Sequence, residues 1–152
     1  MEHKIVTIPG FTVAGIEIRT SNEKAMEEIG GIWGRFFKEG IQGKIPNKAD
    51  KDIIGLYSEY EGDQTKPFKL LVGSKVTSAD NLPAGFVSKT IPSAKYRIFT
   101  AKGKMPDCIG AEWQRIWASD AKRAFTYDFE LYGEKSGTPE NAKVDIYIAI
   151  KD

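Results

Sequence analysis

The residues whose side chains could best serve binding or catalysis lie in one short segment, Tyr127-Asp128-Phe129-Glu130-Leu131-Tyr132. Apolar and polar side chains alternate there with a period of two, which predicts a β-strand with Phe129 and Leu131 on one face. Asp128, Glu130 and Tyr132 then share the other face. A carboxylate in mid-strand is rarely buried alone, because an unpaired buried charge is costly. We therefore expect Glu130 to meet an internal Lys or Arg, solvent on an exposed face, or a cation from outside.

Composition excludes several classes of protein. With 22 basic and 21 acidic side chains the net charge is only +1, which argues against a dedicated nucleic-acid binder. No apolar run approaches membrane-spanning length, and the single Cys108 favours the reducing cytoplasm. The one histidine, His3, and Cys108 give poor support for a metal site, so we expect no metal and no cofactor.

The segments that must position Glu130 follow from periodicity and turn signals. In the first half we predict strands over 4–8 and 11–18, broken at Pro9-Gly10, and then a helix that Ser21 or Asn22 can cap and Gly40 ends. A loop over 41–52 and strands over 53–61 and 68–76 follow. The second half predicts strands over 86–91 and 95–101, a helix from about Pro106 to Ser119, a strand over 127–133, a loop over 136–139 and a strand over 143–150.

The two halves repeat each other. Thr7-Ile8-Pro9 matches Thr90-Ile91-Pro92, the helical segment 29–35 matches 109–115, and Leu56-Tyr57 matches Leu131-Tyr132 at an offset of 131 − 56 = 75. We predict an α+β fold in one domain over 1–152, built from two β-α-β-β repeats at about 1–78 and 86–152. A pseudo-twofold axis relates the repeats. Their strands form one mostly antiparallel sheet of about eight strands, with two helices on one face and a ligand cleft between them.

The 75-residue offset also predicts where a ligand-binding site would lie. It relates Glu130 to Gly55 and Tyr132 to Tyr57, so one half adds an anion where the other offers an open position. Trp33 and Trp113 are equivalent at an offset of 113 − 33 = 80 and lie on the flanking helices. Aromatic walls around one carboxylate suit a lipophilic cation, because the rings supply apolar area and cation–π faces.

A purely structural role is the alternative for each of these residues. Tryptophan and tyrosine at helical or strand spacing are more often core, and we expect Trp117, Phe36 and Phe129 to be buried there. Glu130 could equally lie on a solvated face or pair with an internal cation, for which the candidates are Arg35, Arg115 and Lys143.

Three segments make the sequence resemble the GyrI-like effector-binding domain, above all its stand-alone, integron-associated, cationic-drug-binding type. They are Thr90-Ile91-Pro92 with Tyr96, the helical Trp113-Gln114-Arg115-Ile116-Trp117, and Asp128-Phe129-Glu130-Leu131-Tyr132. The resemblance covers essentially the whole chain. It implies that Glu130 is the glutamate of a drug pocket, with Trp113 and Tyr132 as aromatic neighbours. One departure is Ala142, where some regulators of the family carry a pocket tyrosine.

The expected function is therefore a stand-alone binder of amphipathic, cationic or polyaromatic small molecules. Its candidate ligand-binding residues are Glu130, Trp113, Tyr132, Tyr57, Trp33, Gly55 and Ile109. No helix-turn-helix is predicted before the first strand, so direct binding to nucleic acid is not expected, and neither is a membrane. One alternative is a hydrolase of electrophilic aromatic compounds in which Glu130 works with Tyr132 or Tyr57 as acid and base. The other is a protein-interaction module of the gyrase-inhibitor kind, although no block of like charges marks a docking patch.

Overall fold

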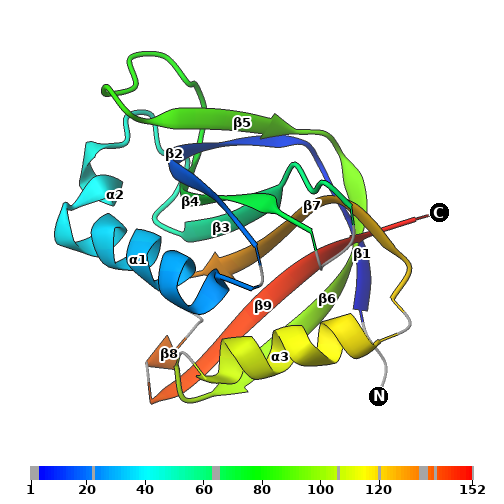
Figure 1. Cartoon of the computed structure of the whole chain (residues 1–152). Coiled ribbons are helices and arrows are strands. Elements are labelled where there is room, and N and C mark those ends of the chain that lie inside the picture. The colour runs from blue at the N-terminus through cyan, green and yellow to red at the C-terminus, as the bar shows by residue number, and fades with distance from the viewer. Residues whose placement is uncertain are drawn as a thin grey trace.

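The computed structural model describes residues 4–21, 23–62, 66–105, 107–119, 121–133, 137–138 and 140–151. His3, Asn22, Pro106 and the ends of the predicted 136–139 loop lie outside these residues. In chain order the elements are β1 (Lys4–Ile8), β2 (Phe11–Thr20), α1 (Ala25–Lys38), α2 (Ile41–Lys44), β3 (Ile53–Ser58), β4 (Phe68–Val76), β5 (Val87–Ile91), β6 (Ala94–Gly103), α3 (Asp107–Ala118), β7 (Arg123–Tyr132), β8 (Gly137–Thr138) and β9 (Asn141–Ile150) (Figure 1).

All strand pairings of the described residues are antiparallel and join the strands into one nine-stranded sheet. The order is β1-β6-β9-β7-β3-β4-β2-β5, with the short β8 paired to β9. This order is symmetric about the central pair of β7 and β3. The first strand of each half pairs with the second strand of the other half, as β1 with β6 and β5 with β2. The predicted α+β fold of two repeats is confirmed, and the repeats exchange their first strands.

The sheet has an apolar cluster on each face. Both long helices, α1 and α3, cover one face (Figure 1), where the main cluster contains Phe36 from α1 and Trp113 and Ile116 from α3. The other face buries a second cluster, which includes Phe129 at 4% exposure. Phe36 is 1% exposed, so the burial predicted for both phenylalanines is confirmed. Within the described residues, no helix is long and apolar enough to cross a membrane.

Four local predictions are wrong. Residues 41–44 form helix α2 rather than a loop, because Ile41 is 2% exposed and anchors one turn in the main cluster. Gly137–Thr138 is a short strand within the predicted loop. Strand β7 begins at Arg123 rather than at residue 127, with a register shift between Arg123 and Asp128. Helix α1 begins at Ala25 without a side-chain cap, so Ser21 does not cap it.

The helical spacing of Ile109, Trp113, Ile116 and Trp117 predicts that these four residues share the apolar face of α3, and the buried face is displaced by about one position. The buried residues are Cys108, Glu112, Trp113 and Ile116, so the stripe follows the spacing 108, 112 and 116. Trp117 lies at the margin of this stripe and is 37% exposed. The prediction that Trp117 belongs to the core is therefore wrong.

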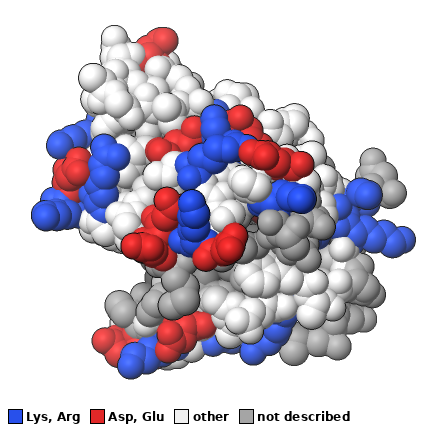
Figure 2. Space-filling model, viewed as in Figure 1, with Lys and Arg blue, Asp and Glu red and all other residues white. Residues whose placement is uncertain are grey.

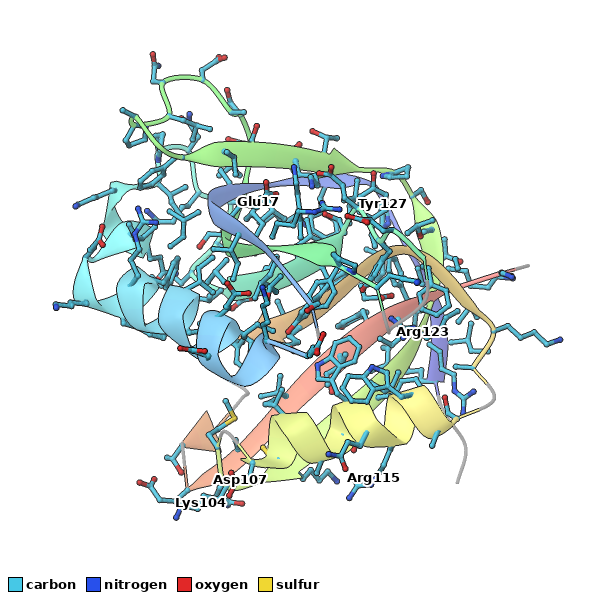
Figure 3. All side chains as sticks on the ribbon, in the orientation of Figure 1. Glu17, Lys104, Asp107, Arg115, Arg123 and Tyr127 are labelled. Atoms are coloured by element: carbon cyan, nitrogen blue, oxygen red, sulfur yellow. The ribbon has the colours of Figure 1, made fainter. Side chains whose placement is uncertain are left out.

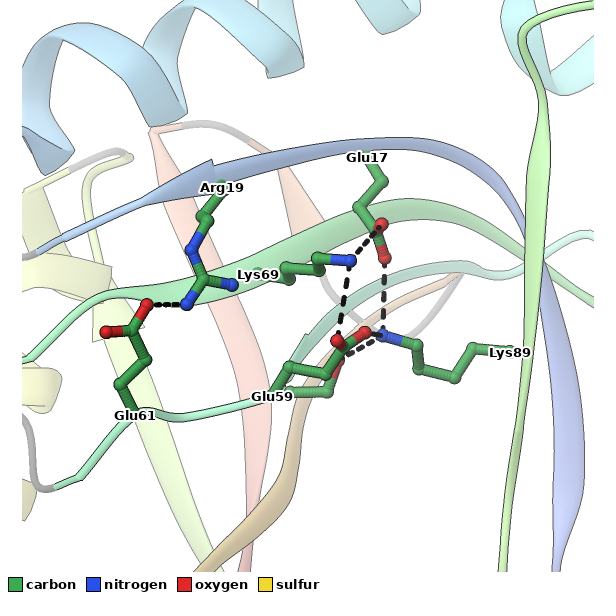
Figure 4. Close-up of polar contacts among 7 residues, drawn as sticks. Glu17, Arg19, Glu59, Glu61, Lys69 and Lys89 are labelled. Atoms are coloured by element: carbon green, nitrogen blue, oxygen red, sulfur yellow. Dashed lines mark hydrogen bonds and ion pairs between the residues drawn. The ribbon is translucent and has the colours of Figure 1, made fainter.

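Hydrogen bonds and ion pairs of charged side chains connect β5, the first strand of the second repeat, to strands of the first repeat. Lys89 of β5 donates hydrogen bonds to Ser58 Oγ at 2.7 Å and to Glu17 Oε2 at 3.3 Å, and it also pairs with Glu59 (Figure 4). Lys69 bridges the same two carboxylates at longer distances, 3.6 Å and 3.4 Å. The Lys89 hydrogen bond is the main cause that lowers the pKa of Glu59. On the face shown in Figure 2, Lys and Arg are interspersed with Asp and Glu.

We expect Lys89→Met to lower the free energy of unfolding by about 1–3 kcal/mol, because hydrogen bonds to charged partners are lost. The Glu17 carboxylate would then keep only the longer contact with Lys69. The matched control is Lys69→Met, which removes a more exposed lysine from the same carboxylates and should cost under about 1 kcal/mol. Urea denaturation at neutral pH measures both variants. Equal losses would contradict the role assigned to Lys89.

Candidate functional site

Glu130 is the centre of a buried polar cluster under α1 and α3. Its carboxylate is 1% exposed and accepts three hydrogen bonds from neutral donors. Tyr57 O–H and Trp113 Nε1–H donate to Oε2 at 2.8 Å and 2.7 Å, and Tyr132 O–H donates to Oε1 at 2.6 Å. The donors come from β3, α3 and β7, so sheet and helix together hold the carboxylate.

The cluster supplies donors but no internal cation. Within the described residues, Glu130 forms no ion pair with a lysine or arginine. Arg35 pairs with Glu39 at 3.0 Å, and Arg115 pairs with Glu112. Lys143 is exposed, on the opposite face of β9 from Ile146, the cross-strand neighbour of Glu130. The three salt-bridge alternatives for Glu130 are therefore not realised.

The protonation of Glu130 reflects two opposing effects. Desolvation by burial raises the pKa of the carboxyl group and is the largest cause, while the hydrogen bonds from Tyr132, Trp113 and Tyr57 lower it. The net direction is upward. In turn, burial and the neighbouring carboxylate raise the pKa of the Tyr57 and Tyr132 hydroxyls well above the ordinary value, so both stay donors.

Gly55 lies directly opposite Glu130 in the β3–β7 pair. Because the two residues are also equivalent in the repeat (130 − 55 = 75), the pseudo-twofold axis passes between them. A Cβ at Gly55 would lie 3.2 Å from Trp33 Cζ2 and 3.4 Å from Glu130 Oε1. The position left open by glycine is thus filled by the edge of the Trp33 ring and by the carboxylate.

Aromatic rings enclose the carboxylate on both sides. Trp113 packs edge-on against Tyr57 with ring centroids 5.1 Å apart, and Trp33 packs edge-on against Tyr132 at 5.0 Å. The cleft predicted between the helices is filled by these rings, and six of the seven candidate residues meet there. Ile109, the seventh, is half-buried against the main cluster beside them.

Sequence reasoning missed a second buried carboxylate, Asp128, two residues from Glu130 on the same strand face. Asp128 Oδ2 accepts from Arg123 Nη2 at 2.8 Å and from Tyr60 O–H at 2.5 Å, and Oδ1 accepts from Ala149 N–H at 2.9 Å. The Arg123 guanidinium lies 4.3 Å from the Phe125 ring centroid, and Figure 3 shows its position near α3. The alternation of β7 indicated a shared face with Glu130, but Tyr60 and Ala149 come from distant segments, and Arg123 reaches Asp128 across the register shift of β7.

The described residues contain no group of three or more histidine, cysteine or acidic side chains that could hold a metal ion. The cluster around Glu130 has one carboxylate and neutral donors.

Comparison with known proteins places this geometry in context. The family model described as Cass2, integron-associated effector binding protein, matches residues 4–150. The integron cassette protein VCH_CASS2, from the mobile metagenome of Vibrio cholerae, is 34% identical, with a TM-score of 0.77 over 98% of this chain and 95% of that chain. The Bacillus subtilis (strain 168) protein YobU, named provisionally as a transcriptional regulator, is 34% identical over 145 residues, 91% of each chain.

A more distant solved structure has the same fold. The protein SAV2435, in a structure whose description says that it is bound to tetraphenylphosphonium, superposes with a TM-score of 0.82. The match covers 99% of this chain and 94% of that chain at 21% identity. At this identity the likeness concerns the fold alone.

The raised pKa of Glu130 predicts how stability depends on pH. Because the folded state holds this proton more tightly than the unfolded state, wild-type stability should fall as pH rises from the unfolded pKa, about 4.3, through the folded value. Glu130→Gln removes that fall. We therefore expect the variant to gain stability relative to wild type between pH 4 and pH 8, as measured by melting temperature. A difference that does not change with pH would contradict the assigned shift.

Proposed function

The chain belongs to the integron-associated effector binding protein family, and we propose that it binds amphipathic organic cations with aryl groups, using Glu130 as the countercharge. The observation that carries the proposal is a carboxylate at 1% exposure, surrounded by aromatic rings and, within the part of the chain that the structure describes, bound by neutral donors only. An uncompensated buried carboxylate is unfavourable for folding alone. A cation that reaches it would supply the missing charge.

The rings around Glu130 define the class of ligand. The rings of Tyr57, Trp113 and Tyr132 present apolar area and negatively polarised faces, which attract a delocalised or quaternary cation, and Trp33 packs against Tyr132 in the free protein. A small hydrated cation would gain little from such walls. Tetraphenylphosphonium, the ligand in the SAV2435 structure, has the required combination of charge and aryl surface and is a suitable first probe.

Protonation couples to this binding. The free protein holds a Glu130 whose pKa is raised, and a bound cation would lower that pKa because the charged carboxylate gains a partner. The ligand must therefore expel a proton at low pH. Cation affinity should fall as pH decreases through the pKa of the free protein.

The direct test compares tetraphenylphosphonium with tetraphenylborate, an anion of nearly the same shape. Wild-type protein should prefer the cation in isothermal titration calorimetry, and ligand at a hundredfold its dissociation constant should add about 2.7 kcal/mol of stability. Glu130→Gln should weaken the cation by about 2–5 kcal/mol and reduce the preference over the anion, since the countercharge is gone.

Glu112→Gln is the matched control, because it removes the same charge from a buried glutamate that pairs with Arg115 on α3. It should leave cation affinity close to wild type. A preference for the anion in wild-type protein, or equal effects of both variants, would overturn the proposal. Water-added product from electrophilic aromatic compounds, detected by mass spectrometry and lost in Glu130→Gln, would instead support the hydrolase alternative.

A further inference from the structure

Trp33 occupies part of the space that a ligand of Glu130 needs. The edge of its six-membered ring lies over Gly55, where Cζ2 would be 3.2 Å from an added Cβ, and Glu130 Oε1 would be 3.4 Å from the same point. The ring and the carboxylate oxygen thus share one small space. A cation cannot come into contact with this oxygen from the α1 side while Trp33 stays where it is.

Trp33 and Trp113 are held in different ways, although the repeat makes them equivalent. Trp113 is 9% exposed, and its indole N–H donates to Glu130 at 2.7 Å, so its ring is fixed against the carboxylate. Trp33 is half-buried against the main cluster and packs on the rings of Phe36, Phe37 and Tyr132, and within the described residues its indole N–H makes no hydrogen bond. An aryl group of a ligand can take the place of the Trp33 ring in such contacts, because a stacked or edge-to-face pair needs only a second aromatic ring.

An exposed ring continues the path from Trp33 to solvent. Phe37, one helical turn further along α1, is 64% exposed and stacks on Trp33 with ring centroids 6.1 Å apart and an angle of 24°. Trp33 in turn contacts Tyr132, whose hydroxyl group donates to Glu130. Aromatic surface therefore runs without interruption from solvent to the buried carboxylate.

We propose that Trp33 is a displaceable plug of the cation site, with Phe37 as the exposed ring along which it moves outward when a ligand binds. The inference rests on the proposed function and adds that Trp33 competes with the ligand rather than forming a fixed wall. It also makes Trp33 a specificity-determining residue. Only a cation with aryl groups can replace the Tyr132 contact that Trp33 gives up, so quaternary ammonium ions without rings should not open the site.

The closing experiment compares Trp33→Ala with Trp113→Ala in titrations with tetraphenylphosphonium and tetramethylammonium. Removing the plug removes the cost of opening, and when the open state is about one-tenth populated the apparent affinity rises about tenfold. Trp33→Ala should therefore bind tetraphenylphosphonium about tenfold tighter and bind tetramethylammonium measurably. Trp113→Ala should bind the aryl cation more weakly than wild type, because a wall and a donor to Glu130 are lost.

Fluorescence gives a second readout on a protein with the site intact. In Trp117→Phe, which removes the exposed tryptophan at the margin of α3, the remaining indoles are Trp33 and Trp113. Ligand binding should shift the emission maximum to the red as Trp33 enters water. A blue shift, or a loss of affinity in Trp33→Ala equal to that in Trp113→Ala, would overturn the plug while binding stands. If wild type and every variant fail to bind the aryl cation, the proposed function itself is wrong.

Discussion

The structure depends on one constraint, which is that Glu130 is buried and, among the described residues, has no lysine or arginine as an ion-pair partner. Three neutral donors satisfy part of the hydrogen-bonding capacity of the carboxylate, yet its pKa is still raised because desolvation dominates. Such a group is tolerated only where its surroundings are firmly held. The central strands β3 and β7 and the α3 residue Trp113 provide that support from three different segments. Among the described residues this carboxylate has no lysine or arginine partner, and the proposed cation site rests on that feature.

The position of Glu130 on the pseudo-twofold axis explains why the two repeats carry different residues at this position. Residues opposite each other on such an axis are equivalent, so a perfectly symmetric chain would place two glutamates or two glycines in this pair. Two carboxylates in contact would repel and force one to stay protonated. Two glycines would offer space without charge. The pair of Gly55 and Glu130 combines one charge with one position that has no side chain, and the edge of the Trp33 ring and the carboxylate itself fill that position.

Periodicity predicted most of the strands, the two long helices and the faces of β7, because these features depend on local spacing. The internal repeat predicted that Glu130, Gly55, Tyr57 and Tyr132 lie close together, because equivalent positions of two symmetry-related halves meet at the pseudo-twofold axis. Helix α2, the early part of β7 and the exposure of Trp117 were not predictable in this way. Each depends on tertiary structure. Ile41 of α2 packs in the main cluster, and Phe125 adopts a φ of 54° within the register shift of β7. In the last turn of α3, Ile116 is the buried residue and Trp117 is not.

Asp128 and Glu130 show how two carboxylates on one strand face acquire different roles. Asp128 has an internal cation, Arg123, whose guanidinium lies against the rings of Phe125, Tyr60 and Trp113. This is a carboxylate and a cation in an aromatic enclosure, completed within the chain. Trp113 is shared, because its ring faces Arg123 while its N–H binds Glu130. Among the described residues, the enclosure around Glu130 has the same parts except the cation. Since Arg123 already neutralises Asp128, the external cation that we propose is assigned to Glu130 rather than to Asp128.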